Sequence, residues 1–223
     1  MNTPDIYFPN LGIEIQHLDR VAFSIFGFDI YKYGAIICLG VILGIILAIY
    51  EAKRTGQNPD DYTDFVFWAI PCGIVGARLY YIIFNGGSLS EFFAIREGGL
   101  AIYGGIIGAV IAVIIYTRIK KLPLLLFTDT AAMSLLIGQI LGRWGNLVNR
   151  EAFGRAYEGL FAMAYKAEQV SGLSIEGSNG IYHGEAVYPL HSLNGTDYIW
   201  VHPTFLYESC WNLMLLIIIF IIS

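Results

Sequence analysis

The stretch from Tyr33 to Tyr50, YGAIICLGVILGIILAIY, contains 18 consecutive residues without a charge. A helix needs about 20 mainly apolar residues to cross the hydrocarbon core of a bilayer, so this segment predicts a transmembrane helix. Four further runs have a similar length and composition, and three of them carry a single charged residue. These runs are Phe65–Phe84, Leu100–Thr117, Leu122–Gly142 and Thr204–Ile222.

The composition of the whole chain agrees with a membrane protein. Hydrophobic residues make up 56% of the 223 residues and charged residues only 14%, which is too little polar surface for a soluble particle of this size. These values exclude a disordered chain, a coiled coil, a secreted disulfide scaffold and an ordinary cytosolic enzyme. We expect an all-α integral membrane protein, a polytopic helical bundle with about five visible spans, because β-barrel strands would be shorter and would alternate.

Charge, cysteine and histidine usage argue against a nucleic-acid partner, a disulfide framework and a metal site. The net charge is −5 and there is no basic block, so nucleic acid is not expected as a partner. Cys38, Cys72 and Cys210 lie in apolar runs and are expected to be buried small hydrophobic residues rather than a disulfide framework. The histidines are too irregularly spaced for a zinc pattern, and no metal or redox cofactor is predicted.

The distribution of Lys and Arg predicts how the chain is oriented. Five basic residues crowd into two short connections, 51–64 and 118–121. Six others are spread over three much longer segments, 1–32, 85–99 and 147–203. Since cytoplasmic loops are enriched in Lys and Arg, the N-terminus and the segment 147–203 are expected outside.

This orientation divides the chain into three parts. Residues 1–146 are expected to form four membrane helices with an outer N-terminal tail, and residues 204–223 a last membrane helix. The segment 147–203 between them is rich in Gly, Ser, Asn, Tyr and His, so we expect an irregular, outward-facing head rather than another span. No basic residue follows the last apolar run, so the natural protein is expected to continue with at least one further span.

The richest polar stretch is GRWGNLVNREAFGR, Gly142–Arg155, where the fourth predicted helix reaches the outer face. In helical geometry, Arg143, Asn146 and Arg150 would share one face. Guanidinium groups are forked, permanently charged donors that match a phosphate. We therefore interpret the stretch as a phosphate site at headgroup depth, and an interfacial anchor with solvated charges is the alternative.

Three further polar residues lie within or beside the spans, where they need an explanation. Arg78 is six residues from the outer end of its run and could either snorkel to the interface or serve a site. Glu208 follows His202 and Pro203 at the start of the last run, where a carboxylate suits a helix N-terminus. Tyr103 is expected either to point its hydroxyl into the bundle or to anchor its helix at the interface. Small residues at helical spacing predict close helix packing at Gly40, Gly44, Gly104 and Gly108.

These segments resemble the prolipoprotein diacylglyceryl transferase family. Its signature is Gly-Arg-x-Gly-Asn-Phe-x-Asn-x-Glu-x-x-Gly, and Leu147 replaces the Phe here. The matching residues are Gly142, Arg143, Gly145, Asn146, Asn149, Glu151 and Gly154. The segments Tyr31–Gly34, Gly76–Tyr81 and His202–Glu208 are similar to the family as well, in the right order, so the resemblance covers the chain from about residue 30 onward.

The resemblance implies a lipid transfer at the outer face of the bacterial cytoplasmic membrane. The implied donor is phosphatidylglycerol, and the acceptor is the thiol of the lipobox cysteine in a prolipoprotein signal peptide. The products would be a thioether-linked diacylglyceryl cysteine and glycerol phosphate, in the first step of lipoprotein maturation. No cofactor is implied.

The resemblance also implies roles for individual residues. The expected phosphatidylglycerol site consists of Arg143, Asn146, Asn149, Glu151, Gly154 and Arg78. Arg143 is expected to stabilise the charge that builds on the leaving phosphate, with Glu151 holding its guanidinium in place.

The thiol must lose its proton during the transfer, and Tyr103, His202 and Glu208 are candidates for accepting or relaying it. Many members of the family carry histidine at the position of Tyr103. Because a tyrosine of ordinary pKa is a poor base, Tyr103 is expected to position the lipid or relay a proton.

Two other classes of function are compatible with the same residues. In a transporter or channel component, Arg78, Asp129 and Glu208 would line a pathway, but such a protein predicts repeats and broken helices that are not visible here. A non-catalytic lipid-binding scaffold is the second alternative, and a lipid-transfer assay would distinguish it from an enzyme.

Overall fold

The computed structural model describes residues 3–85, 92–93, 99–170, 174–175, 181–183 and 186–222. It contains two compact units, which are described separately below. The first consists of Met1–Leu43 and Leu136–Ser223, and the second of Gly44–Leu135. Most of the predicted loop 85–99 and three short parts of the predicted head lie outside the described residues.

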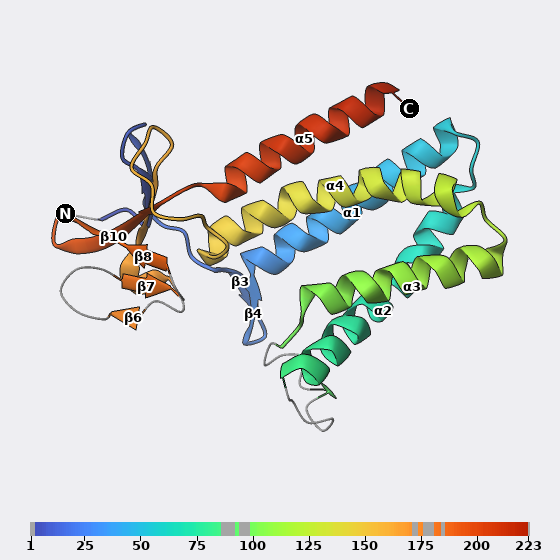
Figure 1. Cartoon of the computed structure of the whole chain (residues 1–223), viewed down its shortest axis with the longest axis horizontal. Coiled ribbons are helices and arrows are strands. Elements are labelled where there is room, and N and C mark those ends of the chain that lie inside the picture. The colour runs from blue at the N-terminus through green and yellow to red at the C-terminus, as the bar shows by residue number, and fades with distance from the viewer. Residues whose placement is uncertain are drawn as a thin grey trace. The chain divides into compact units, whose positions relative to one another are not determined.

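Five helices among the described residues are long and apolar enough to cross a membrane (Figure 1). They are α1 (Lys32–Arg54), α2 (Pro59–Asn85), α3 (Ile102–Lys120), α4 (Leu124–Asn149) and α5 (Thr204–Ile222). Each predicted apolar run overlaps one of these helices, so the prediction of a polytopic helical membrane protein is confirmed.

The surfaces of the helices are apolar, as lipid contact requires. Large aliphatic and aromatic side chains are exposed along all five of them. Cys38 and Cys210 are also exposed and Cys72 is half-buried, so the expectation that these thiols are buried in protein was wrong for two of the three. In a membrane helix, an apolar side chain needs no protein cover, because lipid takes that place.

Glycines allow α2 and α3 to approach closely within the unit Gly44–Leu135. A Cβ atom on Gly104 would meet the carbonyl oxygen of Gly76, and one on Gly108 would meet that of Cys72. The predicted packing role of Gly104 and Gly108 is therefore confirmed. At the other end of this unit, the rings of Tyr62 and Phe127 stack with their centroids 4.5 Å apart.

The other unit contains an antiparallel five-stranded sheet of order β2-β1-β5-β10-β9. Its strands are β1 (Ile6–Phe8), β2 (Ile13–Ile15), β5 (Met163–Lys166), β9 (Leu190–Leu193) and β10 (Thr196–Val201). The fully buried core between them includes Ile6, Met163, Tyr165, Ile199 and Val201. The head is thus more regular than predicted, because the N-terminal tail supplies two of its strands.

Shorter elements complete this unit. They are the hairpin of β3 (Val21–Ile25) and β4 (Phe28–Tyr31), the 3-10 turn η3 (Ala167–Gln169), and the strands β6 (Ser174–Ile175), β7 (Ile181–His183) and β8 (Ala186–Tyr188). The β3–β4 hairpin leads directly into α1, and Figure 1 shows it at the N-terminal end of that helix. Strand β10 of the five-stranded sheet is followed closely by another membrane helix, α5.

Candidate functional site

Arg143 pairs with Glu208 where α4 and α5 pack together. Arg143 Nη2 lies 2.6 Å from Glu208 Oε2, and Nη1 donates to Asn146 Oδ1 at 3.4 Å. The helices are held in place by the Ser209 hydroxyl, which donates to the carbonyl of Ile140 at 3.2 Å. The ion pair is partly exposed, with 32% of the Arg143 side chain and 45% of the Glu208 side chain accessible. Guanidinium donors therefore remain available to an incoming ligand.

The carboxylate of Glu151 accepts hydrogen bonds from side chains in the last turn of α4. Its Oε1 accepts hydrogen bonds from Asn146 Nδ2 and Asn149 Nδ2, both at 3.1 Å. Its backbone N–H donates to the carbonyl of Asn146, also at 3.1 Å. Asn146 thus connects the carboxylate to Arg143, and the polar residues of the signature form one continuous network with Glu208.

Two expectations about this network were wrong. Glu151 was expected to hold the guanidinium of Arg143, but the structure assigns that contact to Glu208. Arg150 was expected to share a helix face with Arg143, but α4 ends at Asn149 and Arg150 has a left-handed φ of 57°. This conformation turns the Arg150 side chain away from the network.

Arg150 instead belongs to a buried ionic cluster around Asp5. Arg150 Nη2 lies 3.4 Å from Asp5 Oδ2 and donates to the carbonyl of Leu18 at 2.9 Å. Asp5 also accepts hydrogen bonds from the Leu18 N–H, Lys166 Nζ and Gln169 Nε2 at 2.9, 3.0 and 3.1 Å. Burial alone would raise the pKa of Asp5, but these hydrogen bonds and the charge of Lys166 lower it to about 2. Burial lowers the pKa of Arg150, which the charge of Asp5 opposes.

His202 lies just before α5, and two tyrosines hold its ring. The imidazole stacks on Tyr157 with centroids 3.8 Å apart, and its Nδ1 is 3.4 Å from the hydroxyl of Tyr207. The N–H of Gly154 donates to the His202 carbonyl at 3.2 Å, and a Cβ on Gly154 would lie 2.7 Å from the His202 Cβ. Gly154 therefore allows the signature loop to approach His202 closely.

The remaining two predicted residues belong to the unit Gly44–Leu135. Arg78 is 4% exposed; its Nη1 donates to the carbonyl of Gly99 at 2.9 Å, and its guanidinium lies 5.6 Å from the centre of the Tyr81 ring. Tyr103 is 67% exposed, and its ring is 6.2 Å from that of Tyr80. The hydroxyl of Tyr103 is thus not buried, and Arg78 holds the segment that precedes α3.

A cavity of about 550 Å³ adjoins the signature network. Its lining consists of Arg20, Tyr31, Tyr33, Gly34, Asn149, Arg150, Glu151, Ala152 and Phe153. The guanidinium of Arg20 donates to the carbonyls of Asn149 and Gln169, both at 3.1 Å. A Cβ on Gly145 would lie 2.7 Å from the ring of Tyr33, so that ring packs directly against α4.

Arg20 and Tyr33 were not assigned a role from the sequence. The segment Tyr31–Gly34 does contain a signal, because it was one of the pieces that resemble the transferase family. Arg20 has no comparable signal, since it lies alone in the N-terminal tail and reaches the cavity only through the fold.

The fold and the site together define a polytopic membrane protein that presents a partly exposed arginine and a carboxamide network at the end of one membrane helix. The family model described as prolipoprotein diacylglyceryl transferase matches residues 20–223. The chain belongs to this family.

Curated relatives agree with this assignment. The chain is 39% identical over 206 residues to a protein of Clostridioides difficile (strain 630), covering 91% of this chain and 71% of that protein. It is 40% identical over 210 residues to a protein of Clostridium novyi (strain NT), covering 92% and 74%. A protein of Halalkalibacterium halodurans is 39% identical over 212 residues, with 93% and 67% covered. All three relatives are named phosphatidylglycerol–prolipoprotein diacylglyceryl transferase.

Proposed function

We propose that this chain transfers the diacylglyceryl group of phosphatidylglycerol to the lipobox cysteine thiol of a prolipoprotein. In this reaction a carbon–sulfur bond forms, the bond between that carbon and the phosphate oxygen breaks, and glycerol phosphate leaves. The family membership and the names of the relatives support this activity. The network of Arg143, Asn146, Asn149, Glu151 and Glu208 is the observation in the structure that carries it.

Arg143 is suited to the leaving phosphate. Negative charge builds on the phosphate oxygens as the carbon–oxygen bond breaks, and a fixed cation beside them stabilises the transition state more than the ground state. The contacts to Glu208 and Asn146 fix the guanidinium before the lipid arrives. Asn146 and Asn149 are held in turn by Glu151, so the site needs little rearrangement on binding.

His202 is the best-placed acceptor for the thiol proton among the three candidates. Glu208 is already engaged by Arg143, and the phenol of Tyr103 is a poorer proton acceptor than an imidazole. An imidazole is the side chain that most often accepts and releases a proton in catalysis. The stacking of His202 on Tyr157 and its contact with Tyr207 orient the ring and leave Nε2 for a substrate.

The proposed location is the bacterial cytoplasmic membrane, with the N-terminus and the segment 147–203 outside. The crowding of Lys and Arg in the connections 51–64 and 118–121 supports this orientation. Phosphatidylglycerol and the signal peptide are both amphiphiles held in the bilayer. A site at the end of a membrane helix lies at the depth of their reacting groups.

A mass measurement tests the activity. The purified protein is reconstituted into phosphatidylglycerol vesicles with a lipobox peptide, and the peptide is then weighed. We expect the mass of one diacylglyceryl group to be added, and no addition to a matched peptide with serine in place of the cysteine. Retained lipid binding without any added mass would instead identify a non-catalytic lipid-binding scaffold.

A further inference from the structure

Among the residues that the structure describes, strands β3 and β4 form a two-stranded ribbon of their own, and its tip is apolar. Its turn consists of Phe26 and Gly27, with φ of 50° and 82°, and Ile25 pairs with Phe28 across it. Two consecutive positive φ values match the twist of a two-residue hairpin, where Asn, Asp or Gly usually takes the first position. Here a phenylalanine occupies that position.

The hairpin exposes apolar side chains at its tip and along the face that Phe23, Ile25 and Phe28 share. Phe26 is 97% exposed and Phe28 68%, and Phe23 and Ile25 are about half exposed. The one charged residue in the two strands, Asp29, accepts a hydrogen bond from the Ser24 hydroxyl. An isolated two-stranded hairpin is only marginally stable in water, so a ribbon this apolar needs an apolar surrounding.

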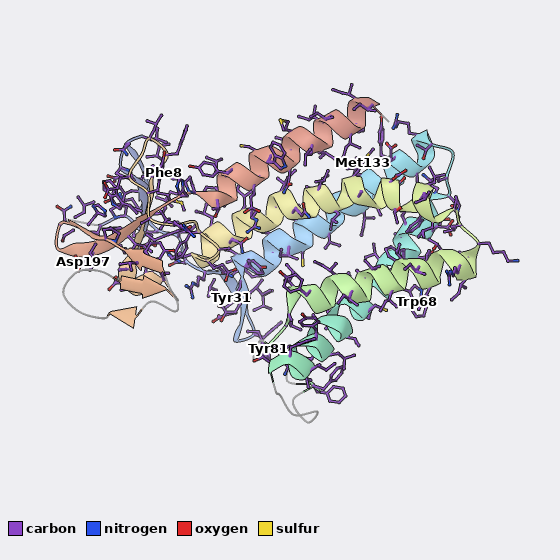
Figure 2. All side chains as sticks on the ribbon, viewed as in Figure 1. Phe8, Tyr31, Trp68, Tyr81, Met133 and Asp197 are labelled. Carbon is purple, nitrogen blue, oxygen red and sulfur yellow. The ribbon has the colours of Figure 1, made fainter. Side chains whose placement is uncertain are left out.

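The position of the hairpin in the chain indicates what that surrounding is. Strand β4 ends at Tyr31, and α1 begins at the next residue, Lys32. The Lys32 N–H donates to the carbonyl of Arg20 at 2.8 Å, so the base of the hairpin is closed at the point where α1 starts. The hairpin projects to one side of this end of α1 (Figure 1), and Tyr31 lies at its base (Figure 2). Because the hairpin is attached to the first residue of a membrane helix, it lies close to the membrane surface.

We propose that the β3–β4 hairpin is a membrane-surface anchor whose tip, Phe26 and Phe28, is inserted at the boundary between headgroups and acyl chains of the outer leaflet. Aromatic side chains favour this layer. Tyr31 at the base of the hairpin also lines the cavity beside the signature network, so the hairpin is connected to one wall of that cavity. This inference goes beyond the proposed transfer reaction and does not depend on it.

The chain contains a matched control hairpin. Strands β9 and β10 are joined by Asn194 and Gly195, with φ of 52° and 79°, so the turn has the same length and the same two positive φ values. Its tip is polar and belongs to the five-stranded sheet. The two turns therefore differ in side chains and surroundings rather than in backbone geometry.

Spin labels at the two tips test the proposal. Phe26→Cys and Asn194→Cys are made separately in the 223-residue chain with Cys38, Cys72 and Cys210 replaced by serine. Each is labelled with a nitroxide and reconstituted into phosphatidylglycerol-containing bilayers. Collision with oxygen, which concentrates in lipid, is then compared with collision with a water-soluble nickel chelate.

We expect the label at position 26 to favour oxygen and the label at position 194 to favour the nickel chelate. Preference for the chelate at both positions would overturn the proposal, because the tip would lie in water. Low accessibility to both reagents at position 26 would also overturn it, because protein, such as a second copy of the chain, would cover the tip. Phe28→Cys is labelled and measured in the same way, as a control for a change in the turn caused by replacing Phe26. If the protein had no transfer activity but the label at position 26 still favoured oxygen, the anchor proposal would be supported and the proposed reaction would not.

Discussion

Arg143 makes two contacts that a lysine at the same position cannot both keep. Its Nη2 pairs with Glu208 and its Nη1 donates to Asn146, and the fork still presents donors to a phosphate. We expect Arg143→Lys to lower the rate of diacylglyceryl transfer by about 10²-fold, the scale of losing one transition-state hydrogen-bond donor, while insertion into the membrane is unchanged. The mass assay on purified protein measures this. Arg118→Lys, in the last turn of α3, is the matched control. Near-normal transfer by the Arg143 variant would contradict the proposed role.

Tyr103 can be tested by comparing two substitutions. Tyr103→Phe keeps the ring and its contact with Tyr80 but removes the hydroxyl, whereas Tyr103→His keeps a group that can donate and accept a proton. If the residue relays a proton or positions the lipid through its hydroxyl, the Phe variant should have a lower kcat than the His variant. Full activity of the Phe variant would show that Tyr103 is an interfacial anchor, which its 67% exposure also permits.

At the scale of elements, the ionic cluster around Asp5 joins strand β1 to the end of α4 and should make the stability of this unit depend on pH. The pKa of Asp5 in the folded protein is about 2, against an ordinary value of 3.8. The ionised carboxylate therefore contributes to the free energy of unfolding above pH 4, and this contribution is lost as the pH falls toward 2. A shift of this size corresponds to about 2 kcal/mol at neutral pH. We expect Asp5→Asn to lower the Tm at pH 7 and the difference from the parent protein to shrink steadily below pH 4.

The control for this experiment is Asp197→Asn. Asp197 lies on β10 of the same sheet but is exposed to solvent (Figure 2), and its replacement should leave the Tm unchanged at every pH. An equal effect of both variants would mean that general charge, rather than the buried cluster, determines the pH dependence.

The contact between α2 and α3 offers a pair of adjacent glycines for a packing test. A Cβ on Gly104 would overlap the Gly76 carbonyl, whereas a Cβ on Gly105 would lie 3.7 Å from the Cβ of Ala77, an ordinary contact. We expect Gly104→Ala to destabilise the protein by about 1–3 kcal/mol and Gly105→Ala to be neutral or slightly stabilising. Thermal unfolding in detergent measures both, and equal stabilities would show that the helices can separate without cost.

The sequence predicted the helices better than the head, for a physical reason. A membrane helix satisfies its backbone hydrogen bonds internally, so a local run such as Tyr33–Tyr50 is sufficient to identify it. The sheet depends on the pairing of Ile6 with Tyr165, which no local pattern reveals. The same limit applies to the site: the signature placed Arg143 and Asn146 on one helix face, but the carboxylate that holds Arg143 comes from α5, far along the chain.

At the scale of the whole molecule, the remaining prediction concerns which ends of the helices face outward. The helices α1 and α3 carry their basic residues in the last turn, Lys53 and Arg54 in α1 and Arg118 and Lys120 in α3. The C-terminal ends of α1 and α3 are therefore expected on the cytoplasmic side. The strands that follow α4 are expected on the outer side. This orientation would place the signature network at the outer face, which is the face where the proposed transfer takes place.

Cysteine labelling in intact cells decides this orientation. Asn194→Cys in the β9–β10 turn and Asn58→Cys in the connection between α1 and α2 are made separately in the background that lacks the three native cysteines. Both positions are exposed, so each thiol should react once a reagent reaches it. We expect a membrane-impermeant maleimide to label position 194 in intact cells and position 58 only after lysis. The reverse pattern would place the signature network on the cytoplasmic face and would separate it from any acceptor that is modified outside.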